Sequence, residues 1–136
     1  MNDLLKAYKN TKYKVSQHDI VIEIDKFNDK LNELLNKYNS TEWAFITAFN
    51  PYSKVLTQVE NIERHNELKE LTNSFLTFEG HGVGEDPTWE PELSLLIIGI
   101  TKEDAILIGN RFEQNAIVLG ESNSAPELFI LNSDLL

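Results

Sequence analysis

One stretch of the sequence, residues 43–68, constrains the fold more than any other. It begins inside a run, Glu42–Ala48, in which both alternating sets of positions are largely apolar, which predicts a strand at the centre of a sheet. Asn50-Pro51 stops this strand, because proline lacks an amide donor and holds the residue before it extended. Thr57 and Glu60 then fit a capping box at the start of a long helix, predicted to end near Asn73. The stretch therefore indicates a domain that combines strands and helices.

The remaining pattern extends this unit in both directions. Apolar periodicity predicts further strands at residues 20–24, 74–79, 93–98, 116–119 and 127–131, and an extended segment at 12–15. A helix is predicted after Asp25 as N-cap, with Phe27, Leu31, Leu34 and Tyr38 on its apolar face, and another after Thr101, with the stripe Ala105, Ile108 and Phe112. From Trp43 the order is β-α-β-β-α-β, the split β-α-β pattern of ferredoxin-like folds. We predict a single α+β domain over residues 1–136, with three main helices and a mostly antiparallel sheet of five or six strands.

Composition sets the class of protein. The 136 residues are 41% hydrophobic and 25% charged, near the averages for globular domains. Cysteine is absent, which excludes disulfides and thiolate chemistry. The longest uncharged apolar segment, Leu93–Ile100, is far shorter than the roughly 20 residues of a membrane span. The N-terminus lacks a signal-peptide pattern, so we expect a cytoplasmic location.

The charge is strongly negative and unevenly distributed. The net charge is −10, yet residues 1–14 carry four lysines against one aspartate. We expect residues 1–14 to be a mobile basic segment and the rest of the surface to repel nucleic acids and anionic membranes. The same surface would attract a basic protein partner, or it serves only solubility.

The second long helix carries the most informative polar residues. Asn61 and Arg64 precede Leu68, Leu71 and Phe75 on one face, so the apolar half of this face should pack on the sheet. An arginine that points partly inward needs a carboxylate or an anionic ligand. With Ser53 and Lys54 just upstream, the pattern resembles an anion pocket. The alternative is that Arg64 pairs with Glu90 or Glu92 and only holds a loop in place.

The segment 79–92 is the second candidate. It holds five acidic residues and His81, which together could bind Mg²⁺ or Mn²⁺, but the spacing matches no metal loop and favours a solvated acidic loop. Glu90 and Glu92 are a candidate acid/base pair. Trp89 is expected either to wall a pocket or to cover the core. His65 and His18 have no partner in the sequence and are interpreted as surface or structural residues, and no metal or cofactor is predicted.

Several segments resemble a known bacterial family, domain of unknown function 3293. They are AYKNTKY (residues 7–13), FITAFNPYS (45–53), ENIERHNEL (60–68), WEPELSLLIIGI (89–100) and RFEQNAIV (111–118). The resemblance implies that Asn50, Pro51, Ser53, Asn61, Arg64, Glu90 and Gln114 occupy motif positions of the family. It implies no function. Members usually have Phe-Gly-Gln where this chain has Phe112-Glu113-Gln114, so a glycine is lost there.

Three functions are compatible with these observations. The leading hypothesis is a binding module for a small anionic or amide-bearing ligand, held by the residues Asn50, Ser53, Asn61, Arg64, Glu90 and Gln114. The second is an acidic inhibitor or immunity-type protein that covers a basic surface of a partner. The third is a small hydrolase that uses Glu90 or Glu92 as general base. The sequence favours a protein that is not an enzyme.

Overall fold

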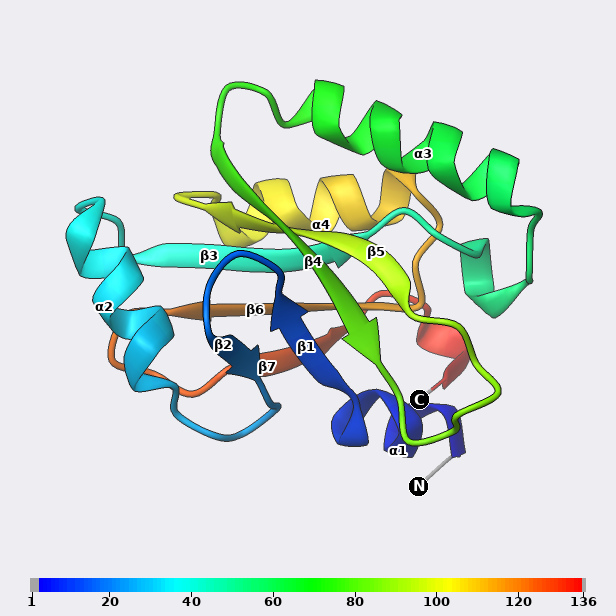
Figure 1. Cartoon of the computed structure of the whole chain (residues 1–136), viewed down its shortest axis with the longest axis horizontal. Helices are drawn as coiled ribbons and strands as arrows, with labels where there is room; N and C mark the ends of the chain where they lie inside the picture. Colours follow the sequence, from blue (N-terminus) through cyan, green and yellow to red (C-terminus); the bar gives the residue numbers. More distant parts are fainter. Residues whose placement is uncertain (1–2, 136) are drawn as a thin grey trace.

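The chain folds around one curled antiparallel sheet, shown in the computed structural model of Figure 1, which describes residues 3–135. The helices are α1 (Asp3–Asn10), α2 (Asp29–Lys37), α3 (Gln58–Leu71) and α4 (Lys102–Arg111), with short 3-10 turns at Pro51–Ser53 and Ser133–Leu135. The strands are β1 (Lys12–Val15), β2 (Ile20–Ile22), β3 (Glu42–Thr47), β4 (Leu76–Val83), β5 (Glu92–Ile98), β6 (Ala116–Glu121) and β7 (Glu127–Ile130). They pair in the order β2-β1-β4-β5-β3-β6-β7. The predicted α+β class is confirmed, with seven strands and four helices among the described residues instead of five or six and three.

The predicted split β-α-β order is present in the middle of the sheet. β5 lies between β3 and β4, and β6 lies on the other side of β3. β3 is therefore central, as its two apolar faces predict, and it pairs with β5 and β6 through Phe45, which faces Leu96 and Val118. The hairpin β1–β2 and the strand β7 extend the sheet at its two ends. Residues 12–15, expected only as an extended segment, form β1, and this strand is the one beyond the predicted six.

Two apolar layers fill the two faces of the sheet. On one face, α3 and α4 pack through Leu68 and Ile108 against a layer that includes Ile46. On the other, concave face, the curled ends of the sheet and α2 enclose a layer that includes Trp43 and Phe45. Residues 43–46 supply alternate side chains to both layers, so the central strand joins the two halves of the core.

The contact of α3 differs in one detail from the prediction. Leu68 is fully buried and Phe75 packs against the same layer, but Leu71 is exposed. Thr72 is buried instead, and its hydroxyl donates to the carbonyl of Leu68 at 2.7 Å. The helix ends at Leu71, so the stripe extrapolated at helical spacing to Phe75 does not continue beyond that point.

Two predicted boundaries are wrong for local reasons. The α2 helix begins at Asp29 because Asn28, not Asp25, accepts the capping hydrogen bond, while Asp25 adopts a left-handed conformation. As a result Phe27 lies outside the helix and is half exposed. Residues 80–83, predicted as the beginning of a loop, continue β4, because β1 pairs with them along the edge of β4 that does not face β5.

The basic N-terminal segment contributes two elements of the fold. Residues 3–10 form α1, and residues 12–14 are part of β1. Within residues 3–135, no helix is long and apolar enough to cross a bilayer. The mobility of the segment 1–14 stays a prediction, and residues 1–2 lie outside the described chain.

Candidate functional site

A pocket of about 690 Å³ opens on the concave face of the sheet, opposite α3 and α4. Its apolar wall comes from the central strand and from both curled ends of the sheet: Phe45 of β3, Tyr13 of β1, Val118 of β6 and Leu128 of β7. α1 and the loop between β4 and β5 lie near each other (Figure 1), and both contribute residues to the lining of the pocket. The volume lies in the range typical of small-molecule sites.

The loop after β3 brings polar groups to this pocket through an unusual backbone. Asn50, Tyr52 and Ser53 all have left-handed φ angles, of 48°, 50° and 62°. Such conformations are uncommon for residues other than glycine, least so for asparagine. The amide of Tyr52 donates to the carbonyl of Glu113 at 2.7 Å, which holds the loop against the end of α4. Strained backbone that the surrounding structure maintains is often found at functional sites.

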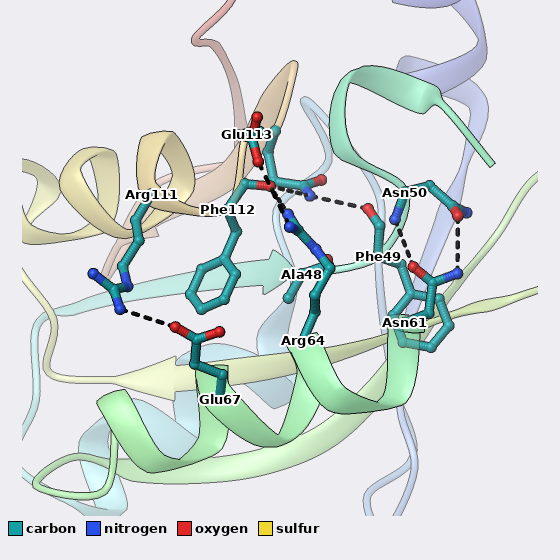
Figure 2. Close-up of polar contacts among 10 residues, drawn as sticks. Ala48, Phe49, Asn50, Asn61, Arg64, Glu67, Arg111, Phe112 and Glu113 are labelled. Atoms are coloured by element: carbon teal, nitrogen blue, oxygen red, sulfur yellow. Dashed lines mark hydrogen bonds and ion pairs between the residues drawn. The ribbon is translucent and has the colours of Figure 1, made fainter. Parts of the chain in front are cut away.

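Asn50 connects the loop to α3 (Figure 2) and to Glu92 through hydrogen bonds. Its backbone amide donates to Oδ1 of Asn61 at 2.9 Å, and Nδ2 of Asn61 donates back to Oδ1 of Asn50 at 2.9 Å. Asn61 is almost fully buried on α3, so this reciprocal pair fixes the position of the Asn50 side chain. The remaining group, Nδ2 of Asn50, donates to Oε2 of Glu92 at 2.7 Å. The helix thus holds the loop, and the loop orients a carboxylate in the pocket.

Glu92 is the partly buried acid of the pocket. It is the first residue of β5, and its side chain lines the cavity. Burial raises the pKa of its carboxyl group above the ordinary value, and hydrogen bonds from the side chains of Asn50 and Trp89 act in the opposite direction. A carboxyl group with a shifted pKa inside a cavity is a candidate functional group.

Gln114 and Ser53, two of the predicted ligand-binding residues, also line the pocket. Gln114 is 7% exposed, and its Nε2 donates to the carbonyls of Phe49 at 3.0 Å and Phe112 at 3.1 Å. Ser53 shares hydrogen bonds with the hydroxyl of Tyr8 at 3.2 Å and with Nδ2 of Asn115 at 3.0 Å. These contacts connect α1, the loop after β3 and the start of β6.

Sequence reasoning missed part of this site. Neither Tyr8 nor Asn115 was expected to contribute, and Glu92 was considered as an ion-pair partner of Arg64, as one of five possible metal ligands and as a general acid or base, but not as a ligand-binding residue. Asn115 is 3% exposed. A polar residue directly before an apolar strand was the available signal, but its partners, Tyr8 and Asn132, lie far away in the sequence. The resemblance pointed to Gln114 without a physical reason, which the carbonyl contacts now supply.

Arg64 does not line the pocket, and its guanidinium donates to groups of the protein itself. Its Nε donates to the carbonyl of Ala48 at 2.6 Å and its Nη2 to the carbonyl of Phe112, while Nη1 lies 3.6 Å from Oε1 of Glu113 (Figure 2). The side chain is 21% exposed, so it is substantially buried as expected. Its carboxylate partner is Glu113 and not Glu90 or Glu92. The guanidinium therefore joins α3 to the ends of β3 and α4, which is a structural role.

Glu90 also lies outside the site. Its side chain is exposed in the loop before β5 and does not line the pocket. The proposed Glu90/Glu92 acid/base pair is thus separated into one surface residue and one pocket residue. β5 begins at Glu92, so Glu90 precedes the strand and the regular alternation of its side chains does not fix its direction; of the two acids, only Glu92 lines the pocket.

His65 is structural, in agreement with the sequence interpretation. It is buried on α3, and its Nε2 lies 2.8 Å from Oε1 of Glu79. Both residues belong to the helix-covered face, away from the pocket. Within the described chain, no three His, Asp or Glu side chains gather closely enough to share a metal ion.

Comparison with known proteins identifies a family and nothing closer. No curated protein and no solved structure matches the chain significantly. A family model described as "Protein of unknown function (DUF3293)" matches residues 46–117, just over half of the sequence. The matched region runs from the end of β3 to the start of β6 and includes Asn50, Asn61, Glu92 and Gln114. The chain therefore belongs to the DUF3293 family of proteins of unknown function.

Proposed function

We propose that the protein is a binding module that holds a small molecule in the concave pocket. The observation that carries this proposal is the Asn50–Glu92 pair, which lies in the lining of a cavity of about 690 Å³ beside an apolar wall. An apolar body would pack against Tyr13, Phe45 and Leu128, and a polar group would meet the pair.

The support structure around the pair is typical of a binding site. Asn61 fixes Asn50 from α3, and Asn50 in turn orients Glu92, so the polar group is held before a ligand arrives. Such preorganisation reduces the entropy lost on binding. Among the predicted ligand residues, Asn50, Ser53 and Gln114 line the pocket and Asn61 positions one of them. Arg64 and Glu90 are absent from the lining, and the absence of the arginine argues against an anionic ligand.

The second candidate function is acid–base catalysis by Glu92. The raised pKa of its carboxyl group favours this candidate, because a general base works best with a pKa shifted towards the operating pH. The separation of Glu90 from the pocket removes the partner that the hydrolase hypothesis used. The inhibitor hypothesis rests on net charge alone, and the geometry of the pocket adds no support to it.

A fragment titration tests the binding proposal. Neutral aromatic fragments, with benzamide as the reference, are titrated into ¹⁵N-labelled protein, and chemical-shift changes are expected at Gly82, Gly84 and the indole of Trp89, which line the pocket. Ala116→Phe adds bulk inside the cavity and should abolish these changes. Val59→Phe adds bulk at an exposed position of α3 and should leave them intact. Shifts that avoid the pocket residues, or that persist in Ala116→Phe, would contradict the proposal.

A further inference from the structure

We propose that the ligand of the concave pocket is a small organic cation, a primary amine or guanidinium on an apolar stem. This inference rests on the proposed binding function and specifies the chemical class of the ligand. It follows from three properties of the lining: its charge, its free hydrogen-bonding groups and its aromatic side chains.

The charge of the lining is negative. Among the described lining residues, Asp3, Glu85, Asp86 and Glu92 are acidic, and Lys6 is basic. Glu85 and Asp86 lie on the exposed loop between β4 and β5, whereas Glu92 is partly buried at the start of β5. A carboxylate inside a cavity attracts a cation more strongly than one in open solvent, because the effective dielectric constant is lower there.

The hydrogen-bonding capacity that remains in the pocket is mostly that of acceptors. The hydroxyls that the sheet places there already donate to backbone carbonyls: Tyr13 to Tyr8 at 2.7 Å, Thr47 to Leu93 at 2.7 Å and Ser94 to Glu92 at 3.0 Å. The Nδ2 group of Asn50 is directed at Glu92. Lys6 and Asn10, both exposed residues of α1, still carry donors, and so does one hydroxyl of the Tyr8–Ser53 pair.

Gln114 gives the clearest sign of a missing donor. Both carbonyls near Nε2 fix the orientation of the amide, and Oε1 accepts no hydrogen bond from any described residue. Among the described residues, His65 Nδ1 is the only side-chain nitrogen or oxygen that is fully buried and has no hydrogen-bond partner. Oε1 of Gln114 is therefore not fully buried, and it is accessible from the pocket that Gln114 lines. Gln114 is otherwise 7% exposed. An amide oxygen that faces the cavity and has no donor within the protein can accept a hydrogen bond from a ligand N–H.

Aromatic rings supply the third property. Tyr13 and Phe45 lie edge to face with ring centroids 5.5 Å apart in the apolar wall, and Trp89 lines the mouth. Ammonium and guanidinium groups are attracted to the faces of such rings, and an apolar stem packs on them. A carboxylate ligand would meet Glu92 as a like charge and would find few donors.

Three probes that share one stem test the charge of the ligand. Phenethylamine, phenethyl alcohol and 3-phenylpropanoate are titrated into the intact protein, with the fluorescence of Trp89 and ¹⁵N shifts as readouts; Trp43 is buried and provides a constant background. We expect phenethylamine to bind at least about tenfold more tightly than the other two, as one charge-assisted hydrogen bond in a partly buried site provides.

Variants assign the effect to the pocket. Glu92→Gln keeps an acceptor for Asn50 and should reduce the affinity for phenethylamine about tenfold, and that for phenethyl alcohol much less. Glu90→Gln removes the same charge from the exposed loop and should change neither. Trp89→Leu, on the same exposed loop, should weaken the amine more than the alcohol.

The outcomes separate this inference from the proposed function. Equal binding of the amine and the alcohol, tighter binding of the carboxylate, or an unchanged amine affinity in Glu92→Gln would overturn the cation assignment and leave the binding function in place. Failure of all three probes to bind would overturn both.

Discussion

Arg64 ties three segments of the chain together through one guanidinium group. It extends from α3 to the carbonyls of Ala48 and Phe112, the groups that end β3 and follow α4. Hydrogen bonds from a charged donor to backbone carbonyls are stronger than those between neutral groups. Its ion pair with Glu113 adds less, because Glu113 is half exposed.

We expect Arg64→Ala to reduce the free energy of unfolding by about 2–3 kcal/mol, because two carbonyls lose a charged donor. Arg111→Ala is the matched control. Arg111 makes a 2.9 Å ion pair with Glu67, but both side chains are more than half exposed, so its removal should cost less than about 1 kcal/mol. Urea unfolding of both variants measures the difference, and equal losses would contradict the role assigned to Arg64.

Glu92 should make the stability depend on pH in a specific direction. Burial raises the pKa of its carboxyl group in the folded state above the ordinary value of 4.5, so the folded protein binds this proton more tightly than the unfolded chain. The contribution of Glu92 is therefore most favourable below pH 4.5 and declines as the pH rises through the raised pKa.

Glu92→Gln removes this decline. The variant should match the parent in stability near pH 4 and exceed it at pH 7, as measured by urea midpoints at the two values. Glu90→Gln, on the exposed loop, controls for the loss of one negative charge. A variant that is less stable than the parent at pH 7 would show that the hydrogen bond from Asn50 outweighs burial.

At the scale of the elements, the close approach of β1 and β4 depends on a glycine. A Cβ atom at Gly80 would lie 2.5 Å from the carbonyl oxygen of Lys14 and 2.8 Å from the ring of Phe45. Backbone atoms cannot move aside as a side chain can, so the strands would have to separate. At Gly84, just beyond the end of β4, a Cβ atom would meet its nearest neighbour, Oγ1 of Thr11, at 4.0 Å, which is an ordinary contact.

Gly80→Ala should therefore destabilise the protein by about 1–3 kcal/mol, the usual cost of overpacking. Gly84→Ala should be close to neutral. Thermal unfolding compares the two variants, and a neutral Gly80→Ala would mean that β1 pairs more loosely with β4 than the register indicates. Because β1 carries Tyr13 into the pocket wall, Gly80→Ala should also weaken ligand binding.

At the scale of the whole molecule, net charge decides which partners can approach. The value of −10 repels nucleic acids, whose affinity for proteins depends mainly on phosphate contacts with clustered basic residues. The local excess of lysine lies in residues 1–14, on α1 and β1. A few such charges support only weak and salt-sensitive attachment.

We expect no complex with duplex DNA or single-stranded RNA in fluorescence anisotropy at 0.15 M salt, where screening reaches about 8 Å. Lys6→Gln/Lys9→Gln is the suitable control for residual binding at low salt, because residues 12–14 belong to the sheet. Binding at 0.15 M salt that survives this double substitution would show a nucleic-acid surface elsewhere on the molecule.

Much of the fold was predictable because it depends on local patterns. Three such patterns act over a few residues, and all three are present in the structure: the capping box of Thr57 and Glu60, the N-cap at Thr101, and the apolar residues on both faces of β3. The order of elements from β3 to β6 likewise follows from periodicity and short connections. The ends of α2 and β4 were not predictable, since competing caps and pairing with β1 decide them.

The sequence by itself determined the class of the domain, its central strand, its acidity and the set of polar residues around the Asn-Pro turn. Only the tertiary structure decided what each polar residue does, because a side chain acts through neighbours that are distant in the chain. Arg64 donates to carbonyls at the ends of β3 and α4, whereas Glu92 lies on the concave face and accepts a hydrogen bond from Asn50. The pocket itself exists because the sheet curls until β1 and β7 share one wall, and no short stretch of sequence records that curvature.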